Sequence, residues 1–151
     1  MTQEEQQLLF RVICTELPYG ITVQQSAKYP KEHFAHSVAD KWETEPHDFN
    51  IIGIEGTNTL ITDKRKEERT HAKGIVSSPI TIPIHNGFTG QEIKPYLRPM
   101  SSMTEEEKKE QYKFSAFNNV ELFDWLNVHH FDYRGLIEKG LALEAPKEMY
   151  A

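Results

Sequence analysis

The residue types best suited to chemistry gather in one short stretch, where His129, His130, Asp132, Tyr133 and Arg134 lie close together in the sequence. Imidazole and carboxylate groups bind zinc and other divalent ions, and the same pair can carry out acid/base catalysis. A structural role also fits, because cationic side chains at a helix end complement the negative end of its dipole. The stretch therefore allows three interpretations: a metal site formed by the two histidines and the aspartate, a catalytic pair, or one packed histidine beside an exposed one.

A second group of possible ligands comprises His33, His36 and Asp40. If residues 31–41 form a helix, spacings of three and four place the three side chains on one face, where they can hold a metal ion. The glutamate that a zinc-protease helix carries between its histidines is missing. A solvated helix face explains the same pattern, and we prefer that explanation.

A candidate ligand site is formed by Tyr96, Arg98, His130 and Arg134. Tyrosine and arginine can present an aromatic ring and a cation to a nucleotide-like anion, provided that the side chains converge on one pocket. A well-packed extended crossover explains Tyr96 and Arg98 equally well. Convergence of these residues would favour ligand binding, whereas dispersal would favour an interaction module.

The charge of the chain limits the partners that it can take. Lysine and arginine number 17 against 23 aspartates and glutamates, so nonspecific binding to nucleic acid has no overall support. Residues 64–73 are locally basic, but Glu67 and Glu68 interrupt them. This segment is either a solvated connection, which we prefer, or a contact for an anion or RNA.

The single cysteine, Cys14, cannot form an internal disulfide, and we expect a reduced thiol buried on the apolar side of a helix. The first residues, MTQEEQQLLF, lack the basic start and long apolar run of a signal peptide. We therefore expect a cytoplasmic protein without membrane contact. Phosphate loops, dinucleotide-binding glycines and nucleophile elbows are missing, and no cofactor is predicted.

The first part of the chain predicts a helix followed by strands. Thr2 and Glu5 form a capping box, and Leu8, Leu9, Val12 and Ile13 recur at helical spacing. The pattern changes to alternation at 21–25, which indicates a strand. Residues 50–55 and 59–62 predict a hairpin around Gly56-Thr57-Asn58, and residues 74–84 an edge or bulged strand, because Pro79 and Pro83 cannot donate ladder hydrogen bonds.

The last third predicts helices. After an extended stretch at 95–99, Ser102 or Thr104 caps a surface helix that runs to about Lys113. A helix from Asn118 or Asn119 to Val128 has a broad apolar face and should be central to the core. Residues 133–141 favour a short helix that Gly140 ends.

Aromatic and aliphatic residues of this last part are expected to build the core. We predict that Trp125, Leu126, Phe131 and Leu136 are mostly buried, and that Phe123 also helps to cover the sheet. On this interpretation His130→Ala and Asp132→Ala destabilise the protein less than Trp125→Ala does.

Three phrases carry a resemblance to known proteins: LPYG at 17–20, IKPYLRPMSSMTEEE at 93–107 and DWLNVHHFDYRGLIEKGLALEAP at 124–146. They resemble uncharacterised small proteins encoded by phages, prophages and mobile elements of gut Bacteroidales. The resemblance covers about the first 25 residues and residues 93–146, and residues 26–92 have no counterpart in it. It implies an origin, a mobile-element accessory protein in a bacterial cytoplasm, and no activity, cofactor or catalytic residue.

We predict a single α+β domain over residues 1–151, with a helix and strands in 1–92 and a crossover and helices in 93–151. A small, mainly antiparallel sheet or partly open barrel is flanked by the N-terminal helix and the C-terminal helical segment. The predicted function is noncatalytic binding of a host or phage protein. The alternatives are a small-ligand binder for a nucleotide-like anion and, more weakly, a metal-dependent hydrolase.

Overall fold

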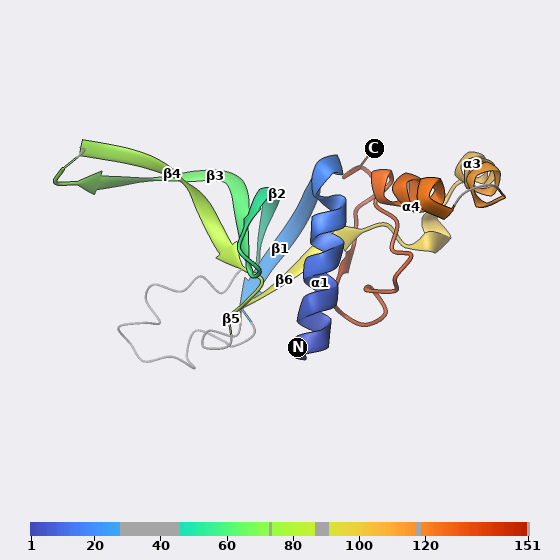
Figure 1. Cartoon of the computed structure of the whole chain (residues 1–151), viewed down its shortest axis with the longest axis horizontal. Coiled ribbons are helices and arrows are strands. Elements are labelled where there is room, and N and C mark those ends of the chain that lie inside the picture. Colours follow the sequence, from blue (N-terminus) through green and yellow to red (C-terminus); the bar gives the residue numbers. More distant parts are fainter. Residues whose placement is uncertain (28–45, 73, 87–90, 117–118, 151) are drawn as a thin grey trace. The chain divides into compact units, whose positions relative to one another are not determined.

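The computed structural model describes residues 1–27, 46–72, 74–86, 91–116 and 119–150 (Figure 1). The chain divides into two compact units, Met1–Lys94 and Pro95–Ala151, so the boundary lies close to the predicted division after residue 92. That the units form one domain stays a prediction. The predicted helix at 31–41, with His33, His36 and Asp40, lies outside the described residues.

The first helix, α1 (Gln3–Glu16), begins with the predicted capping box. The Thr2 amide donates to Glu5 Oε2 at 2.6 Å, and the Glu5 amide donates to Thr2 Oγ1 at 3.1 Å. The stripe of α1 that is buried consists of Leu9, Val12, Ile13 and Glu16.

Cys14 was expected on that buried stripe, and this prediction is wrong, because the cysteine is exposed. A stripe at spacings of three and four from Leu9 passes through positions 12, 13 and 16, and residue 14 lies on the other side of the helix. Partial burial of the thiol nevertheless raises the pKa of Cys14 above its ordinary value.

A 3-10 turn, Leu17–Tyr19, ends α1, and Gly20 follows with a φ of 79°, a conformation that favours glycine. Strand β1 (Ile21–Ala27) then begins. Ile21 and Val23 are buried while Thr22 between them is not, so the predicted alternation is confirmed.

The predicted hairpin is formed by β2 (His47–Glu55) and β3 (Thr59–Thr70), with Glu55 opposite Thr59. Both strands are longer than predicted. The basic segment that begins at Lys64 belongs to β3 as far as Thr70, so its interpretation as a connection is wrong. Its polar residues resemble a loop, but their cross-strand partners are supplied by β4 (Gly74–Pro83), which local sequence does not reveal.

The sheet has the order β4-β3-β2-β1-β6-β5, with β5 at His85–Asn86 and β6 at Gln91–Leu97. Strand β4 lies at an edge, as its two prolines predicted, and the register of β3 against β4 shifts between Ile61 and Arg65. The pairs β1–β2, β2–β3, β3–β4 and β5–β6 are antiparallel. The predicted α+β class, with a mainly antiparallel sheet, is therefore confirmed.

In the second unit, Tyr96 and Leu97 of β6 pair in parallel with the short strand β7 (Leu143–Glu144). Helix α3 (Glu105–Ser115) begins at Thr104, which forms a capping box with Glu107. Helix α4 spans Asn119–Val128. Both helices lie close to their predicted bounds. No described helix has the length and apolar character needed to cross a membrane.

Helix α4 contributes fewer side chains to the core than predicted. Trp125 and Leu126 are buried with Met103 and Phe131, and Leu136 is fully buried as well, as predicted. Phe123, however, is 46% exposed, so the prediction that it covers the sheet is wrong. Only one stripe of a helix can face a core, and in α4 that stripe contains Trp125. The apolar residues left outside it are Val120, Phe123 and Val128.

The short helix predicted at 133–141 is replaced by turns. Gly135 and Gly140 have φ angles of 70° and 71°. Gly135 lies inside the predicted helix, and a right-handed helix needs a negative φ at every residue. Gly140 still ends the segment, because the Leu141 amide beyond it donates to the Leu136 carbonyl at 2.9 Å.

Candidate functional site

The backbone reverses direction at the end of α4 through His130. The Phe131 amide donates to the Leu126 carbonyl at 2.9 Å, and the His130 amide donates to the Asn127 carbonyl at 3.0 Å. These two bonds form a Schellman motif, in which the residue at the turn adopts the left-handed conformation. His130 does so with a φ of 58°, in a position that glycine usually occupies.

The turn after α4 is joined to Arg98. The Arg98 amide donates to the His130 carbonyl at 2.7 Å, and the Asp132 amide donates to the Arg98 carbonyl at 2.8 Å. The Arg98 guanidinium also lies over the Phe131 ring, 4.2 Å from its centroid. Two of the phrases that carry the resemblance, around Arg98 and around His130, therefore meet in the second unit.

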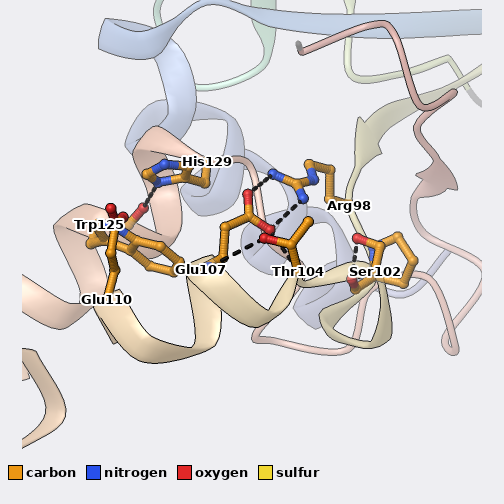
Figure 2. A network of polar contacts seen from close by, with 8 residues as sticks. Arg98, Ser102, Thr104, Glu107, Glu110, Trp125 and His129 are labelled. Atoms are coloured by element: carbon orange, nitrogen blue, oxygen red, sulfur yellow. Dashed lines mark hydrogen bonds and ion pairs between the residues drawn. The ribbon is translucent and has the colours of Figure 1, made fainter. Parts of the chain in front are cut away.

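Arg98 makes a bidentate ion pair with Glu107 on the first turn of α3 (Figure 2). The two guanidinium nitrogens donate to the two carboxylate oxygens at 2.9 and 3.0 Å. This hydrogen bonding, opposed by partial burial and aided by the Thr104 amide, lowers the pKa of Glu107 below its ordinary value. The positive charge that the sequence offered for an anionic ligand is thus already paired.

Asp132 organises the turns that follow it. Its Oδ1 accepts from the Leu136 amide and its Oδ2 from the Ile137 amide, both at 2.8 Å. The side chain is buried as well. Both carboxylate oxygens therefore serve as acceptors for backbone amides in the turns after Asp132. Among the described residues, no three His, Cys, Asp or Glu side chains lie close enough together to hold a metal ion.

His129 is held against α4. Its Nδ1 lies 2.9 Å from the Trp125 carbonyl oxygen, which can only accept, so a hydrogen bond here needs the hydrogen on Nδ1. The His129 and Trp125 rings lie against each other with centroids 4.3 Å apart and planes tilted by 32°. Trp125 in turn donates from Nε1 to Glu110 of α3 at 3.3 Å (Figure 2).

A pocket of about 630 Å³ opens beside this network in the second unit. Its wall combines two prolines, an alanine and a tyrosine ring with charged groups of both signs. Residues of the wall include Arg98, Pro99, Glu107, His129, Pro146 and Tyr150. A volume of this size suits a small ligand or a few residues of a peptide.

The four predicted ligand-binding residues converge in part. Arg98 lines the pocket. The Tyr96 carbonyl accepts a hydrogen bond from the hydroxyl of Tyr150, another lining residue, at 2.9 Å, and the His130 ring stacks on that of Tyr150 with centroids 3.8 Å apart. Arg134 does not line the pocket, and its guanidinium lies over the Tyr133 ring. Their role in binding a ligand stays a prediction.

Sequence reasoning missed three important residues of the pocket: Glu107, Lys147 and Tyr150. Glu107 lies in the acidic first turn that the sequence predicts for this helix, but that signal does not reveal its pairing with Arg98. Lys147 and Tyr150 lie beyond β7 without any local motif. They reach the pocket because the Ala145 amide donates to the Leu97 carbonyl at 2.8 Å and holds the following segment there.

A scan against protein-family models gives no match for this chain, and searches of the curated proteins and of the solved structures give none either.

Proposed function

We propose that this protein acts without catalysis, by binding a segment of another protein in the pocket of the second unit. The observation that supports this proposal is the composition of the pocket wall. Pro99, Pro146 and Tyr150 provide an apolar contact surface, and polar groups lie beside them. Apolar rings with a few polar groups beside them can hold a side chain of a peptide.

The charges around the pocket favour a peptide over a phosphate-bearing ligand. Arg98 is neutralised by Glu107, which the lowered pKa keeps ionised at neutral pH. Glu144 and Lys147 add one charge of each sign. A polyanion would therefore meet two carboxylates along with the two cations, whereas a peptide carries groups of both kinds.

The resemblance to mobile-element proteins of gut Bacteroidales extends the proposal to the partner. On this view the partner is a bacterial or phage protein, and binding takes place in the bacterial cytoplasm. The protein would then act by occupying its partner.

A photo-crosslinking experiment in a Bacteroides host tests the proposal. A crosslinking amino acid replaces Ala145, a half-buried residue of the pocket wall, and the matched control places it at Ala116, an exposed residue at the end of α3. We expect one protein to be crosslinked repeatedly from position 145 and not from position 116. Melting curves of both variants check that they fold.

Two results would overturn the proposal. One is the absence of any reproducible crosslinked protein from position 145 in folded protein. The other is equal crosslinking of the same proteins from both positions, which indicates random contact.

A second function, binding of a small nucleotide-like anion, is favoured by the presence of Arg98, His129 and Lys147 in the same wall. A ligand that binds only the folded protein raises its melting temperature by mass action. Thermal-shift measurements with millimolar nucleotides test this function. Stabilisation that Lys147→Glu removes would support it, and no stabilisation by any nucleotide would exclude it for the compounds tested.

A further inference from the structure

The outer parts of β3 and β4 form a two-stranded arm in the first unit. Six residues of β3, from Arg65 to Thr70, pair with six of β4, from Gly74 to Pro79, whereas the register of β2 with β3 ends at Thr62. Figure 1 shows these ends of β3 and β4 running together away from the other strands of that unit. Isolated two-stranded ribbons are marginally stable in water, so contact with a partner would stabilise this arm.

One side of the arm, the arginine face, carries an unusual set of side chains. Alternation along the strands and the register of β3 with β4 place Arg65, Glu67 and Arg69 on the same face as Ile75, Ser77 and Pro79. Arg69 lies opposite Ile75, which is 63% exposed. An exposed isoleucine beside arginines is typical of a protein interface, where arginine is enriched.

Arg65 is positioned before any partner arrives. Its Nε donates to Ser77 Oγ at 2.9 Å and its Nη2 donates to the Ser77 carbonyl at 2.8 Å. The guanidinium therefore reaches across from β3 to β4 and places its charge over the edge strand. Holding this side chain in place lowers the entropy lost on binding.

The edge of β4 is suited to pairing with another strand. In the described part of the chain, β4 has β3 as its only neighbour in the sheet. Natural edge strands usually carry charges or prolines that prevent pairing, and all ten residues of β4 are uncharged. Pro79 and Pro83 restrict a continuous ladder to residues 74–78, ahead of the first proline.

Charge identifies the class of partner. The six residues from Lys64 to Arg69 include four basic and two acidic side chains, in a chain whose net charge is -6. Glu67 lies between the two arginines on their face. Its negative charge would repel the phosphates of a nucleic acid, which follow one another without a gap. An acidic peptide in extended conformation can place two carboxylates four residues apart on one face, so that it meets both arginines and avoids the glutamate between them.

We infer that an extended acidic segment of a partner protein adds as a strand to the outer edge of β4 at residues 74–78, with its carboxylates paired to Arg65 and Arg69. This inference rests on the proposed function, because it describes a second contact with a protein partner. Main-chain hydrogen bonds supply part of the affinity and the arginines supply the preference for acidic sequences.

Fluorescence anisotropy with labelled octapeptides tests the inference on the full chain. The probes are a threonine octapeptide with glutamate at its second and sixth positions (the Glu-Thr peptide), the matching Lys-Thr peptide, and the Glu-Thr peptide with a central threonine replaced by proline. We expect only the first to bind, since proline removes a ladder donor and lysine reverses the charge. The double variant Arg65→Glu/Arg69→Glu should weaken binding by roughly tenfold or more, whereas Arg11→Glu/Lys113→Glu, at exposed sites outside the arm, should change it little.

Several outcomes would overturn the inference. The first two are no binding of the Glu-Thr peptide and equally strong binding of the lysine or proline probe. A third is tighter binding of a mixed-sequence DNA duplex, if the double arginine variant abolishes that binding. A fourth is a dimer of the chain in sedimentation that the peptide does not dissociate. The crosslinking from position 145 separates this test from that of the proposed function. If the crosslinked partner persists while the peptide fails to bind, the inference is wrong and the proposed function stands.

Discussion

His130 has a backbone conformation that costs a residue with a Cβ about 1–2 kcal/mol. Its place at the end of α4 is one where glycine is the common choice, and its buried ring stacks on Tyr150 of the pocket wall. The stacking of the side chain therefore offsets the cost of the backbone. A glycine here would ease the turn but leave Tyr150 without this contact.

We predict that His130→Ala destabilises the protein more than His130→Gly does. Both variants lose the ring stack, but only alanine keeps the left-handed strain, so the two should differ by about 1 kcal/mol in the free energy of unfolding. Urea denaturation measures the difference. Equal stabilities would show that the turn imposes no such strain.

The ion pair of Arg98 with Glu107 should make stability depend on pH. Because the pKa of Glu107 is lowered in the folded state, its contribution is present above the pKa of the unfolded chain and disappears as the pH falls through the folded value. Glu107→Gln should therefore cost stability at pH 7 and little at strongly acidic pH. Urea midpoints of the variant and of the wild type, measured from pH 7 to strongly acidic pH, give this loss of stability. Glu105→Gln, on the exposed side of α3, is the control and should have a small effect throughout.

Asp132 should matter more for stability than the sequence led us to expect. Asp132→Ala leaves two backbone amides without their acceptors, and unsatisfied amides of this kind cost about 1–3 kcal/mol each when buried. We therefore predict a loss of roughly 2–4 kcal/mol, similar to that of a core truncation. Asp132→Asn retains one acceptor and should lose less. Chemical denaturation of the two variants checks the order, and an alanine variant as stable as wild type would contradict it.

At the scale of elements, α4 joins the core through one narrow stripe. Trp125 packs on Phe131 with ring centroids 5.7 Å apart and is 8% exposed, while Phe123 on the same helix contacts Tyr133 and is 46% exposed. The helix has ten residues, so only a few of its side chains can face inward.

This difference predicts unequal effects of truncation along α4. Trp125→Ala should cost about 3–5 kcal/mol, because it empties a buried site and removes the hydrogen bond to Glu110. Phe123→Ala should cost clearly less, since about half of its surface is already in water. Thermal or urea unfolding compares them, and equal losses would mean that Phe123 belongs to the core.

At the scale of the whole molecule, β6 is shared between the two units. Its first residues lie in the sheet of the first unit, and Tyr96 and Leu97 pair with β7 in the second. Because β6 runs through the boundary as one continuous strand, we expect a single cooperative unfolding transition.

We predict that thermal unfolding followed by far-UV circular dichroism and by tryptophan fluorescence gives coincident curves. The first signal reports mainly the strands and helices of the entire chain, whereas the second includes Trp125 of the second unit. Two separated transitions would instead indicate that the units fold independently, and the prediction of a single domain would be wrong.

The sequence by itself determined the features that depend on neighbours along the chain. The capping box at Thr2, a helix start near Thr104, the turn at Gly56 and an edge or bulged position for β4 follow from spacings of a few residues and from the missing amide hydrogens of proline. The burial of Trp125 follows from helical periodicity in the same way. These effects depend on neighbours in the sequence, and the residue types involved favour few other local conformations.

The tertiary structure alone decided how the polar residues are used. The sequence allowed Arg98 an anion-binding or a structural role and Asp132 a metal-binding or a structural one, and in the fold Glu107 and the Leu136 and Ile137 amides are their partners. Lys64 and its neighbours became a strand because β4 supplied the other side of the ladder. A charged or hydrogen-bonding group takes whichever partner the fold brings within about 3 Å, and that choice depends on contacts that sequence spacing does not encode.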